Sequence, residues 1–158
     1  MSPQKVAEQF VTAINAHDVE RLASLMTSDH RFVDSLGAVV EGRDSMRDGW
    51  KFYFAMVSDY HLEISRFFGA EAAKNETMLV GVASGSYWSD GVKRPNSGWS
   101  TPVALRAVVR DGQIAEWQVY ADNEPIRHQM RAVQAEPIDE ANSESVREQA
   151  GPIAIQTQ

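Results

Sequence analysis

The chain has 158 residues, of which 43% are hydrophobic, and this is enough for one domain with a core of its own. Its formal net charge of −7 argues against binding to a phosphate backbone or an anionic membrane surface, so we expect neither nucleic acid nor membrane partners. The sequence holds no cysteine, which excludes disulfides and thiolate chemistry. The first 30 residues show no basic and apolar leader, and no apolar run reaches the roughly 18 residues that span a bilayer. We therefore expect a cytoplasmic protein.

The charge is unevenly distributed along the chain. Residues 132–158 hold five acidic side chains and one basic side chain, whereas all the aromatic residues lie before this segment. A segment with an excess of one charge and no aromatic side chain cannot build a core of its own. We predict a domain over residues 1–131, followed by an acidic tail over residues 132–158.

Three helices are predicted in the first part of the chain. Ser2 as N-cap and Pro3 at the first helical position start the first helix, which we expect to reach about Ala16. Asp18 is placed to cap the second helix, and the third opens at residues 42–45. Apolar residues recur at helical spacing in all three. These residues are Val6, Phe10 and Ile14 in the first helix, Val19, Leu22, Leu25 and Met26 in the second, and Met46, Trp50, Tyr53, Phe54 and Val57 in the third.

The following segments have the pattern of strands. Residues 30–41 indicate two short strands around Gly37, with His30, Phe32 and Asp34 on one face of the first, because side chains alternate along a strand. Four longer strands, each bounded by turn residues, are predicted at residues 60–68, 77–88, 100–110 and 113–122. A short helix follows the last strand. This order predicts an α+β fold in which helices cover one face of a curved antiparallel sheet.

The last two strands indicate which face of the sheet is buried. Odd-numbered positions from 103 to 109 and from 115 to 121 are wholly apolar, so we expect them to face the helices. The even positions include Arg106, Gln118 and Tyr120, a mixture that suits contact between two sheets better than simple exposure. We therefore predict a homodimer formed through the outer face of the sheet.

Several segments together resemble the nuclear transport factor two-like superfamily, and within it the SnoaL-like and ketosteroid-isomerase-like branch. They are two helices, a strand and turn with the sequence FVDSLG, a third helix that opens with EGRDSM, and four strands that end with EWQVYAD. The resemblance covers about residues 4–131. It implies a cystatin-like α+β roll, in which a cone-shaped, curved, mixed sheet wraps around three N-terminal helices. This scaffold carries isomerases, dehydratases, epoxide hydrolases, polyketide cyclases and non-catalytic binders, so it implies a fold rather than one reaction.

The segment FVDSLG resembles the part of ketosteroid isomerases that carries the general base, which puts Asp34 at that position. Those enzymes also hold the developing oxyanion with a tyrosine and a protonated aspartic acid. Here the tyrosine position is Phe10, and the acid position falls at Ala104 or Leu105. Because both donors are missing, steroid isomerisation by that mechanism is disfavoured. Asp34 also has a structural interpretation, as a turn residue that hydrogen-bonds the backbone before Gly37.

Two other branches of the superfamily suggest further positions. Limonene-epoxide-hydrolase-like members line the cavity with two acids and an arginine, but Val103, Leu105 and Val119 occupy the comparable places, so that chemistry is disfavoured. SnoaL-type polyketide cyclases use an aspartate at the end of the final strand, where Asp122 is the nearest match. By strand alternation Asp122 points away from the cavity unless the strand is bulged. An N-cap or Asx turn ahead of Pro125 is its structural interpretation.

His30 shares the predicted face of Asp34 and is a candidate to orient that carboxylate or exchange a proton with it. The interpretation that we favour from the sequence is a histidine at a strand edge that faces solvent. The other histidines have no acidic or histidine partner at ligand spacing. We expect no metal site and no cofactor.

Aromatic side chains are expected to converge on the interior of the cone and to supply the wall of an apolar pocket. Tyr53 is the best remaining hydroxyl donor for a ligand there. For Phe54 we favour a place in the core, because an aromatic stripe on a helix is more often core than pocket. The predicted substrate-binding residues are Phe10, Ile14, Phe32, Trp50, Tyr53, Phe54, Trp99, Leu105, Trp117 and Val119.

These observations predict a SnoaL-like enzyme that acts on a small hydrophobic molecule, with Asp34 as general acid or base. Isomerisation, dehydration, cyclisation and hydrolysis all remain open, because each needs only that group and a shaped, dry cavity. The alternative is a non-catalytic module of the same fold that binds a small ligand or forms a dimeric assembly.

Overall fold

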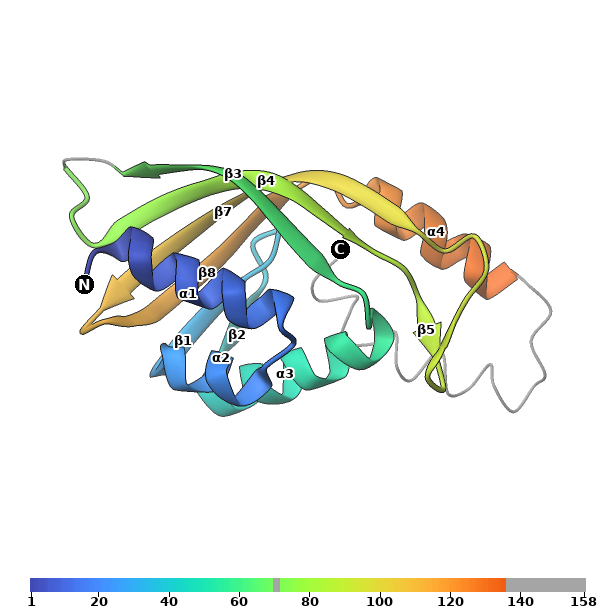
Figure 1. The fold of residues 1–158 in the computed structure, drawn as a ribbon, viewed down its shortest axis with the longest axis horizontal. Coiled ribbons are helices and arrows are strands. Elements are labelled where there is room, and N and C mark those ends of the chain that lie inside the picture. The colour runs from blue at the N-terminus through green and yellow to red at the C-terminus, as the bar shows by residue number, and fades with distance from the viewer. Residues whose placement is uncertain (70–71, 136–158) are drawn as a thin grey trace.

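The computed structural model of the chain describes residues 1–69 and 72–135, which form helices and two sheets. The strands of the large sheet are β1 Met26–Val33, β2 Val39–Glu41, β3 His61–Gly69, β4 Glu76–Gly85, β7 Trp99–Arg110 and β8 Gln113–Ala121. They are arranged in the order β2-β1-β8-β7-β4-β3. β1 and β8 pair in parallel, whereas the other neighbouring strands pair antiparallel. A mixed, curved sheet in an α+β fold is therefore confirmed (Figure 1).

Three helices lie together on one side of this sheet (Figure 1). They are α1 Pro3–Asn15, α2 Val19–Leu25 and α3 Arg43–Met56. The predicted caps are present, because Ser2 Oγ accepts from the Lys5 N–H and the Asp18 carboxylate accepts from the Arg21 N–H. The apolar stripes of the helices pack on the inner face of the sheet and form one core with it.

The second helix is one residue shorter than its apolar stripe predicted. Met26 begins β1 instead of ending α2, and it pairs across the sheet with Ile114 of β8. The strand thus starts four residues earlier than predicted, because the sequence pattern placed its start at His30. Met26 is fully buried in the strand, so its apolar side chain serves the core in either conformation. Pairing with a distant strand decides between them.

The predicted strand over residues 77–88 ends early, because β4 stops at Gly85. Beyond it, β5 Trp88–Ser89 and β6 Val92–Lys93 form a separate hairpin. The end of β4 is tightly packed, since a Cβ atom at Gly85 would lie 2.4 Å from Val57 Cγ1 and 3.1 Å from Trp99 Cζ2. The chain therefore passes this point only with a glycine.

The inner face of the sheet follows the predicted alternation with one correction. The odd-numbered residues of β7 are buried, as is Trp117 of β8. The pairing of β7 with β8 shifts register between Val108 and Val109. Because of this bulge, Ile114 and not Ala115 faces the core.

The outer face of the sheet carries a chain of ion pairs across five strands. Arg31 lies 3.6 Å from Glu41 and 2.6 Å from Glu116, and Arg106 lies 2.5 Å from Glu116 and 2.6 Å from Glu76. These side chains are partly exposed, so each pair adds little stability. Their main effect is that the charges on this part of the outer face are paired with one another.

The last described helix, α4, spans Glu124–Ala135. It begins where the Asp122 carboxylate accepts from the Glu124 N–H at 2.9 Å, and Ile126 and Val133 bury its inner side. The helix crosses the predicted domain boundary at residue 131, and residues 136–158, with most of the predicted acidic tail, lie outside the described residues. None of the helices in the described part is long and apolar enough to cross a membrane.

Candidate functional site

A cavity of about 50 Å³ lies between the helices and the inner face of the sheet. Half of its lining residues are aromatic. The lining residues are Phe32, Trp50, Tyr53, Tyr60, Ala83, Trp99, Thr101, Val103, Trp117, Val119, Asn123 and Ile126. The volume has room for a few water molecules, whereas pockets for drug-sized ligands measure about 300–1,000 Å³. A ring-sized ligand therefore enters only if part of the wall moves.

The structure divides the predicted substrate-binding residues into two groups. Six of them line the cavity, namely Phe32, Trp50, Tyr53, Trp99, Trp117 and Val119. The other four are Phe10, Ile14, Phe54 and Leu105, which are buried in the surrounding core. Phe10 packs with its ring centre 4.8 Å from that of Trp117, and Phe54 stacks between His17 and Trp50. These core side chains hold the aromatic wall in place.

Six further lining residues were not among the predicted substrate-binding residues. Thr101 and Val103 belong to the apolar or small odd-numbered positions of β7, so strand alternation could have indicated both. Tyr60 and Asn123 lie outside helices and strands. No periodicity applies there, and only the tertiary fold brings these two side chains to the cavity.

Asp34 is 1% exposed and directly follows β1. Its Oδ1 accepts from the N–H groups of Leu36 and Ala38, both at 2.9 Å, as the structural interpretation predicts. Its Oδ2 is buried without a hydrogen-bond partner in the described part of the chain. Strand pairing sets Val33 opposite Gln118, so Asp34 lies at the level of Val119 and on the same face as Phe32, both of which line the cavity. Asp34 itself is not among the residues that line the cavity. One carboxylate oxygen thus fixes the turn, and the other is enclosed without a partner in the described part of the chain.

His30 is fully buried, which shows that the solvent-facing interpretation is wrong. Its Nδ1 lies 2.8 Å from the carbonyl oxygen of Ile114, and since a carbonyl only accepts, Nδ1 carries the hydrogen. Burial lowers the pKa of His30 below its usual value, although the bond to Ile114 acts in the opposite direction. Four residues of extended strand separate the Cα atoms of His30 and Asp34 by about 13 Å. We therefore place His30 in the core, too far from Asp34 to exchange a proton directly.

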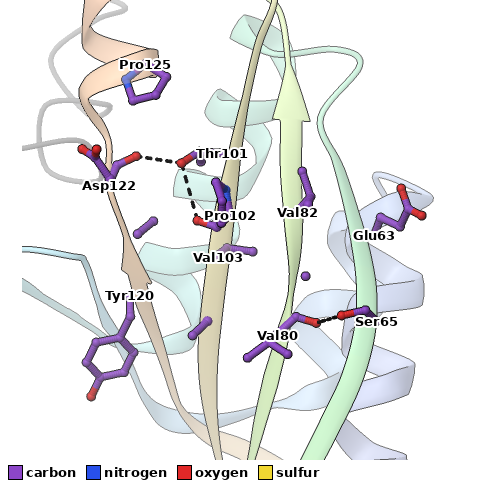
Figure 2. Close-up of a pocket in the computed structure, with 13 residues that line it drawn as sticks. Glu63, Ser65, Val80, Val82, Thr101, Pro102, Val103, Tyr120, Asp122 and Pro125 are labelled. Carbon is purple, nitrogen blue, oxygen red and sulfur yellow. Dashed lines mark hydrogen bonds between the residues drawn. The ribbon is translucent and has the colours of Figure 1, made fainter.

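Asp122 faces the other side of the sheet, as strand alternation predicted. Its backbone oxygen accepts from Thr101 Oγ1 at 2.8 Å, while its carboxylate caps α4 and is exposed. On this outer face of the sheet, Asp122 helps to line a shallow depression of about 900 Å³, which we call the outer groove (Figure 2). The outer groove is lined by Glu63, Ser65, Val80, Gly81, Val82, Thr101, Pro102, Val103, Ala104, Tyr120, Ala121, Asp122 and Pro125. The Asp34 and Asp122 carboxylates thus lie on opposite faces of the sheet.

Three donors belong to the cavity wall. The indole nitrogens of Trp50 and Trp99 are buried and have no hydrogen-bond partner among the described residues. Burial raises the pKa of the Tyr53 hydroxyl well above its ordinary value, so this group stays protonated. These donors therefore belong to residues that line the cavity, while the indole nitrogens of Trp50 and Trp99 are themselves enclosed.

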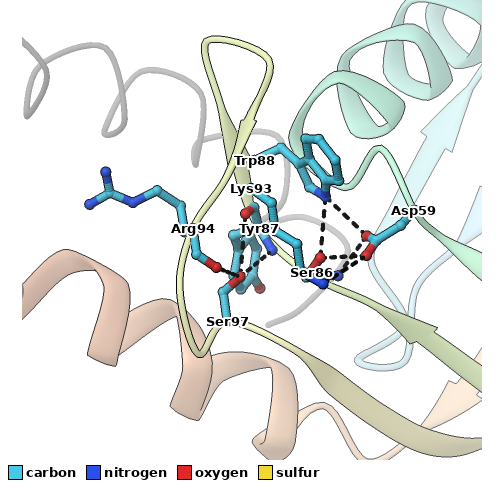
Figure 3. A network of polar contacts seen from close by, with 7 residues as sticks. All are labelled: Asp59, Ser86, Tyr87, Trp88, Lys93, Arg94 and Ser97. Atoms are coloured by element: carbon cyan, nitrogen blue, oxygen red, sulfur yellow. Dashed lines mark hydrogen bonds and ion pairs between the residues drawn. The ribbon is translucent and has the colours of Figure 1, made fainter.

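A polar network joins the hairpin of β5 and β6 to Asp59, which lies in the turn after α3 (Figure 3). Asp59 accepts from the Ser86 N–H at 2.8 Å, from Ser86 Oγ at 2.5 Å and from Trp88 Nε1 at 3.2 Å. Burial opposes the charged form, but these hydrogen bonds outweigh it and lower the pKa of Asp59. Next to Ser86, the Tyr87 hydroxyl donates to the carbonyl oxygen of Ile126 at 3.3 Å. The network thus attaches the hairpin to the turn after α3, and the Tyr87 bond connects the same segment to Ile126 of α4, which lines the cavity.

A comparison with models of protein families shows to which family the chain belongs. A family model of the SnoaL-like domain matches residues 7–117. The chain belongs to the SnoaL-like family. A comparison with curated protein sequences finds no match. In the described ranges, this SnoaL-like protein shows no group of three or more His, Cys, Asp or Glu side chains that could hold a metal ion.

Solved structures show the same fold. A ketosteroid isomerase-like protein from Catenulispora acidiphila, solved with trimethylamine, is 20% identical, with a TM-score of 0.67 over 82% of this chain and 93% of that chain. A cystatin-fold protein from Novosphingobium aromaticivorans is 22% identical, with a TM-score of 0.64 over 75% and 97%. IdmH from Streptomyces antibioticus, a candidate polyketide cyclase, is 20% identical, with a TM-score of 0.67 over 83% and 99%. These likenesses confirm the predicted cystatin-like roll of the SnoaL-like branch.

Proposed function

We propose that this SnoaL-like protein is an enzyme that acts on a small hydrophobic molecule in the aromatic cavity, with Asp34 as its general acid or base. The observation that carries the proposal is that the two oxygens of the Asp34 carboxylate differ in their hydrogen bonding. Asp34 Oδ1 is held by two backbone N–H groups, whereas Oδ2 is buried and unpartnered among the described residues. A proton-transfer group has to be held in place and yet keep one atom free for the substrate.

The surroundings of Asp34 support this role. Phe32 and Val119, which share the face and level of Asp34, line a largely apolar cavity, and low-dielectric surroundings strengthen electrostatic interactions with a bound molecule. Structures with the same fold include candidate polyketide cyclases from Xanthomonas campestris and Pseudomonas putida. Cyclisation, isomerisation and dehydration each move a proton at a carbon atom, which is the step that Asp34 would perform.

Hydrogen exchange at carbon tests the proposal before the natural substrate is known. We would dissolve 2-tetralone or 1-indanone in D₂O with the protein and follow the loss of the α-proton signals by NMR. The wild-type protein is expected to speed the exchange of at least one ketone above the buffer rate. Asp34→Asn keeps Oδ1 as an acceptor for the turn but removes the base, so the rate should fall about 100-fold or more.

The matched control is Asp48→Asn, which changes an exposed carboxylate of α3 and should leave the exchange rate unchanged. Two results would contradict the catalytic proposal. One is a wild-type rate equal to that of buffer for both ketones, and the other is an unchanged rate in Asp34→Asn.

The second candidate function is binding without catalysis. It is favoured by Phe10, which is buried in the core at the position that the resemblance to ketosteroid isomerases gives to a tyrosine, and by Leu105, which is buried in the same core. Ala104 instead lines the outer groove. Neither candidate position for the second acid thus supplies a donor to the cavity. A ligand that binds the cavity while Asp34→Asn leaves every exchange rate unchanged would favour this function.

We also propose that a second copy of the chain packs on the outer groove. Tyr120 and Val82 expose 48% and 40% of their surface there, next to a part of the sheet whose charges are already paired. Tyr120→Glu should convert a dimer to a monomer in light scattering, because it buries an unpaired charge in the interface. Val92→Glu, which changes an exposed residue of the hairpin, is the control. A monomeric wild-type protein would contradict the proposal.

A further inference from the structure

Two hollows of the molecule meet at the start of α4. One is the aromatic cavity, to which α4 contributes Ile126. The other is a crevice of about 450 Å³, lined by residues 98–100 at the start of β7 and by Glu124, Pro125, His128 and Gln129 of α4. Glu124 and His128 are exposed, so the crevice is open to solvent. Trp99 lines both spaces. The starts of α4 and β7 therefore form the boundary between the cavity and this crevice.

The other walls of the cavity belong to elements that are fixed on several sides. Trp117 and Val119 lie on β8, which pairs with both β1 and β7. Trp50 lies on α3, where its ring stacks on Phe54 with ring centres 5.2 Å apart and meets Phe10 edge-on. An opening of the cavity through these walls would break strand pairing or disrupt the main core.

The remaining wall, α4, is packed more lightly. Within Glu124–Ala135, two of twelve residues are buried, namely Ile126 and Val133, whereas α1 buries six of thirteen. The chain just before α4 is held in place, because Thr101 Oγ1 donates to the backbone oxygen of Asp122 at 2.8 Å. Segments with few buried apolar contacts are the ones that open locally at low cost in free energy. We therefore expect α4 to turn about Asp122 while the sheet and the first three helices keep their positions.

A hydrogen bond connects the first turn of α4 to the segment before β5. Tyr87 is 5% exposed, and its hydroxyl donates to the carbonyl oxygen of Ile126 at 3.3 Å. Burial raises the pKa of this hydroxyl, so it keeps its hydrogen. The Tyr87 N–H donates to Ser97 Oγ at 3.0 Å, and Ser97 Oγ donates to the carbonyl oxygen of Arg94 at 2.7 Å (Figure 3). Tyr87 is thus fixed in its own loop and holds Ile126 at the wall of the cavity.

We propose that the first turn of α4 is a gate through which the substrate enters the aromatic cavity from the crevice, and that the Tyr87 hydroxyl keeps this gate closed. Opening moves Ile126 away from Trp99 and joins the spaces of about 50 Å³ and about 450 Å³. The joined space has the size of a pocket for small molecules, roughly 300–1,000 Å³. Closing the gate excludes water from the bound molecule. The inference rests on the proposed function, which makes the cavity the substrate site.

The absence of cysteine from the chain permits a direct test by thiol reactivity. Ala83 lines the cavity and is 5% exposed, so Ala83→Cys introduces one thiol there. We would add dithiodipyridine, a neutral aromatic disulfide, and follow the released thiopyridone by absorbance. The thiol should react far more slowly than that of Val92→Cys, which changes an exposed residue. Adding Tyr87→Phe, which removes the hydroxyl and keeps the ring, should raise the rate roughly three- to tenfold, and adding Ile126→Ala should also raise it.

Ala107→Cys is the matched control. Ala107 is fully buried on the neighbouring strand β7 and is not among the residues that line the cavity, so Tyr87→Phe should leave the reaction rate of this thiol unchanged. Equal acceleration of both thiols would mean general destabilisation and would overturn the inference. The same holds if Tyr87→Phe leaves the rate of Ala83→Cys unchanged, or if that thiol already reacts as fast as the one in Val92→Cys. These rates report entry alone, whereas α-proton exchange in Asp34→Asn reports catalysis, so the two proposals fail separately.

Discussion

The two oxygens of Asp34 predict different consequences for two substitutions at the same site. Asp34→Ala removes the acceptor of the Leu36 and Ala38 N–H groups. A hydrogen bond contributes about 0.5–1.5 kcal/mol net. Leu36 and Ala38 lie in an exposed turn, where water can partly replace the lost acceptor. We therefore expect the free energy of unfolding to fall by about 2 kcal/mol for the two bonds together.

Asp34→Asn should behave differently, because its Oδ1 can accept both hydrogen bonds and only Oδ2 is replaced. We expect it to lower the free energy of unfolding by less than about 1 kcal/mol while it abolishes α-proton exchange. Urea unfolding followed by circular dichroism measures both variants, and equal slopes show that the unfolded states are comparable. If Asp34→Asn is as destabilised as Asp34→Ala, the division between a structural and a chemical oxygen is refuted.

Two further predictions concern the frame of the cavity. Gly85→Ala should lower the free energy of unfolding by about 1–3 kcal/mol, as overpacking does, because the new Cβ would lie 2.4 Å from Val57 Cγ1. Gly69→Ala, where nothing lies within 4 Å of such a Cβ, is the control, and equal urea midpoints for the two variants would speak against tight packing at Gly85. Burial lowers the pKa of His30 in the folded protein. As the pH falls, His30 therefore becomes protonated in the unfolded chain before it does so in the folded protein. The free energy of unfolding should thus decline as the pH falls below 6.5, the ordinary histidine value. His30→Asn should flatten that decline in unfolding curves between pH 7 and 5, whereas His61→Asn, which changes an exposed residue, should not.

Features with local causes were predictable from the sequence. The starts of α1 and α2 depend on Ser2 and Asp18, whose side chains bond backbone groups three residues away. The buried face of β7 depends on strict alternation, which places Leu105 inside and Arg106 outside. The turn role of Asp34 has the same local character. Such interactions are completed within a few residues, so the residue order contains all that is needed to infer them.

Features that depend on pairing between distant segments were not predictable. Met26 suits either a helix or a strand, and its register with β8 decides the outcome. His30 is buried, and its Nδ1–H donates to the carbonyl oxygen of Ile114, 84 residues away in the chain. Tyr60 and Asn123 reach the cavity from irregular segments.

Length and composition predicted one domain with a sufficient core, and the residue pattern determined the α+β class, the helix caps and a carboxylate in a tight turn. Only the tertiary structure decided that one oxygen of Asp34 and the indole nitrogens of Trp50 and Trp99 are buried without a hydrogen-bond partner among the described residues. The physical reason is that a hydrogen bond between near neighbours in the chain can be inferred from the residue order. A buried group without one is recognised only when every neighbour in space is known.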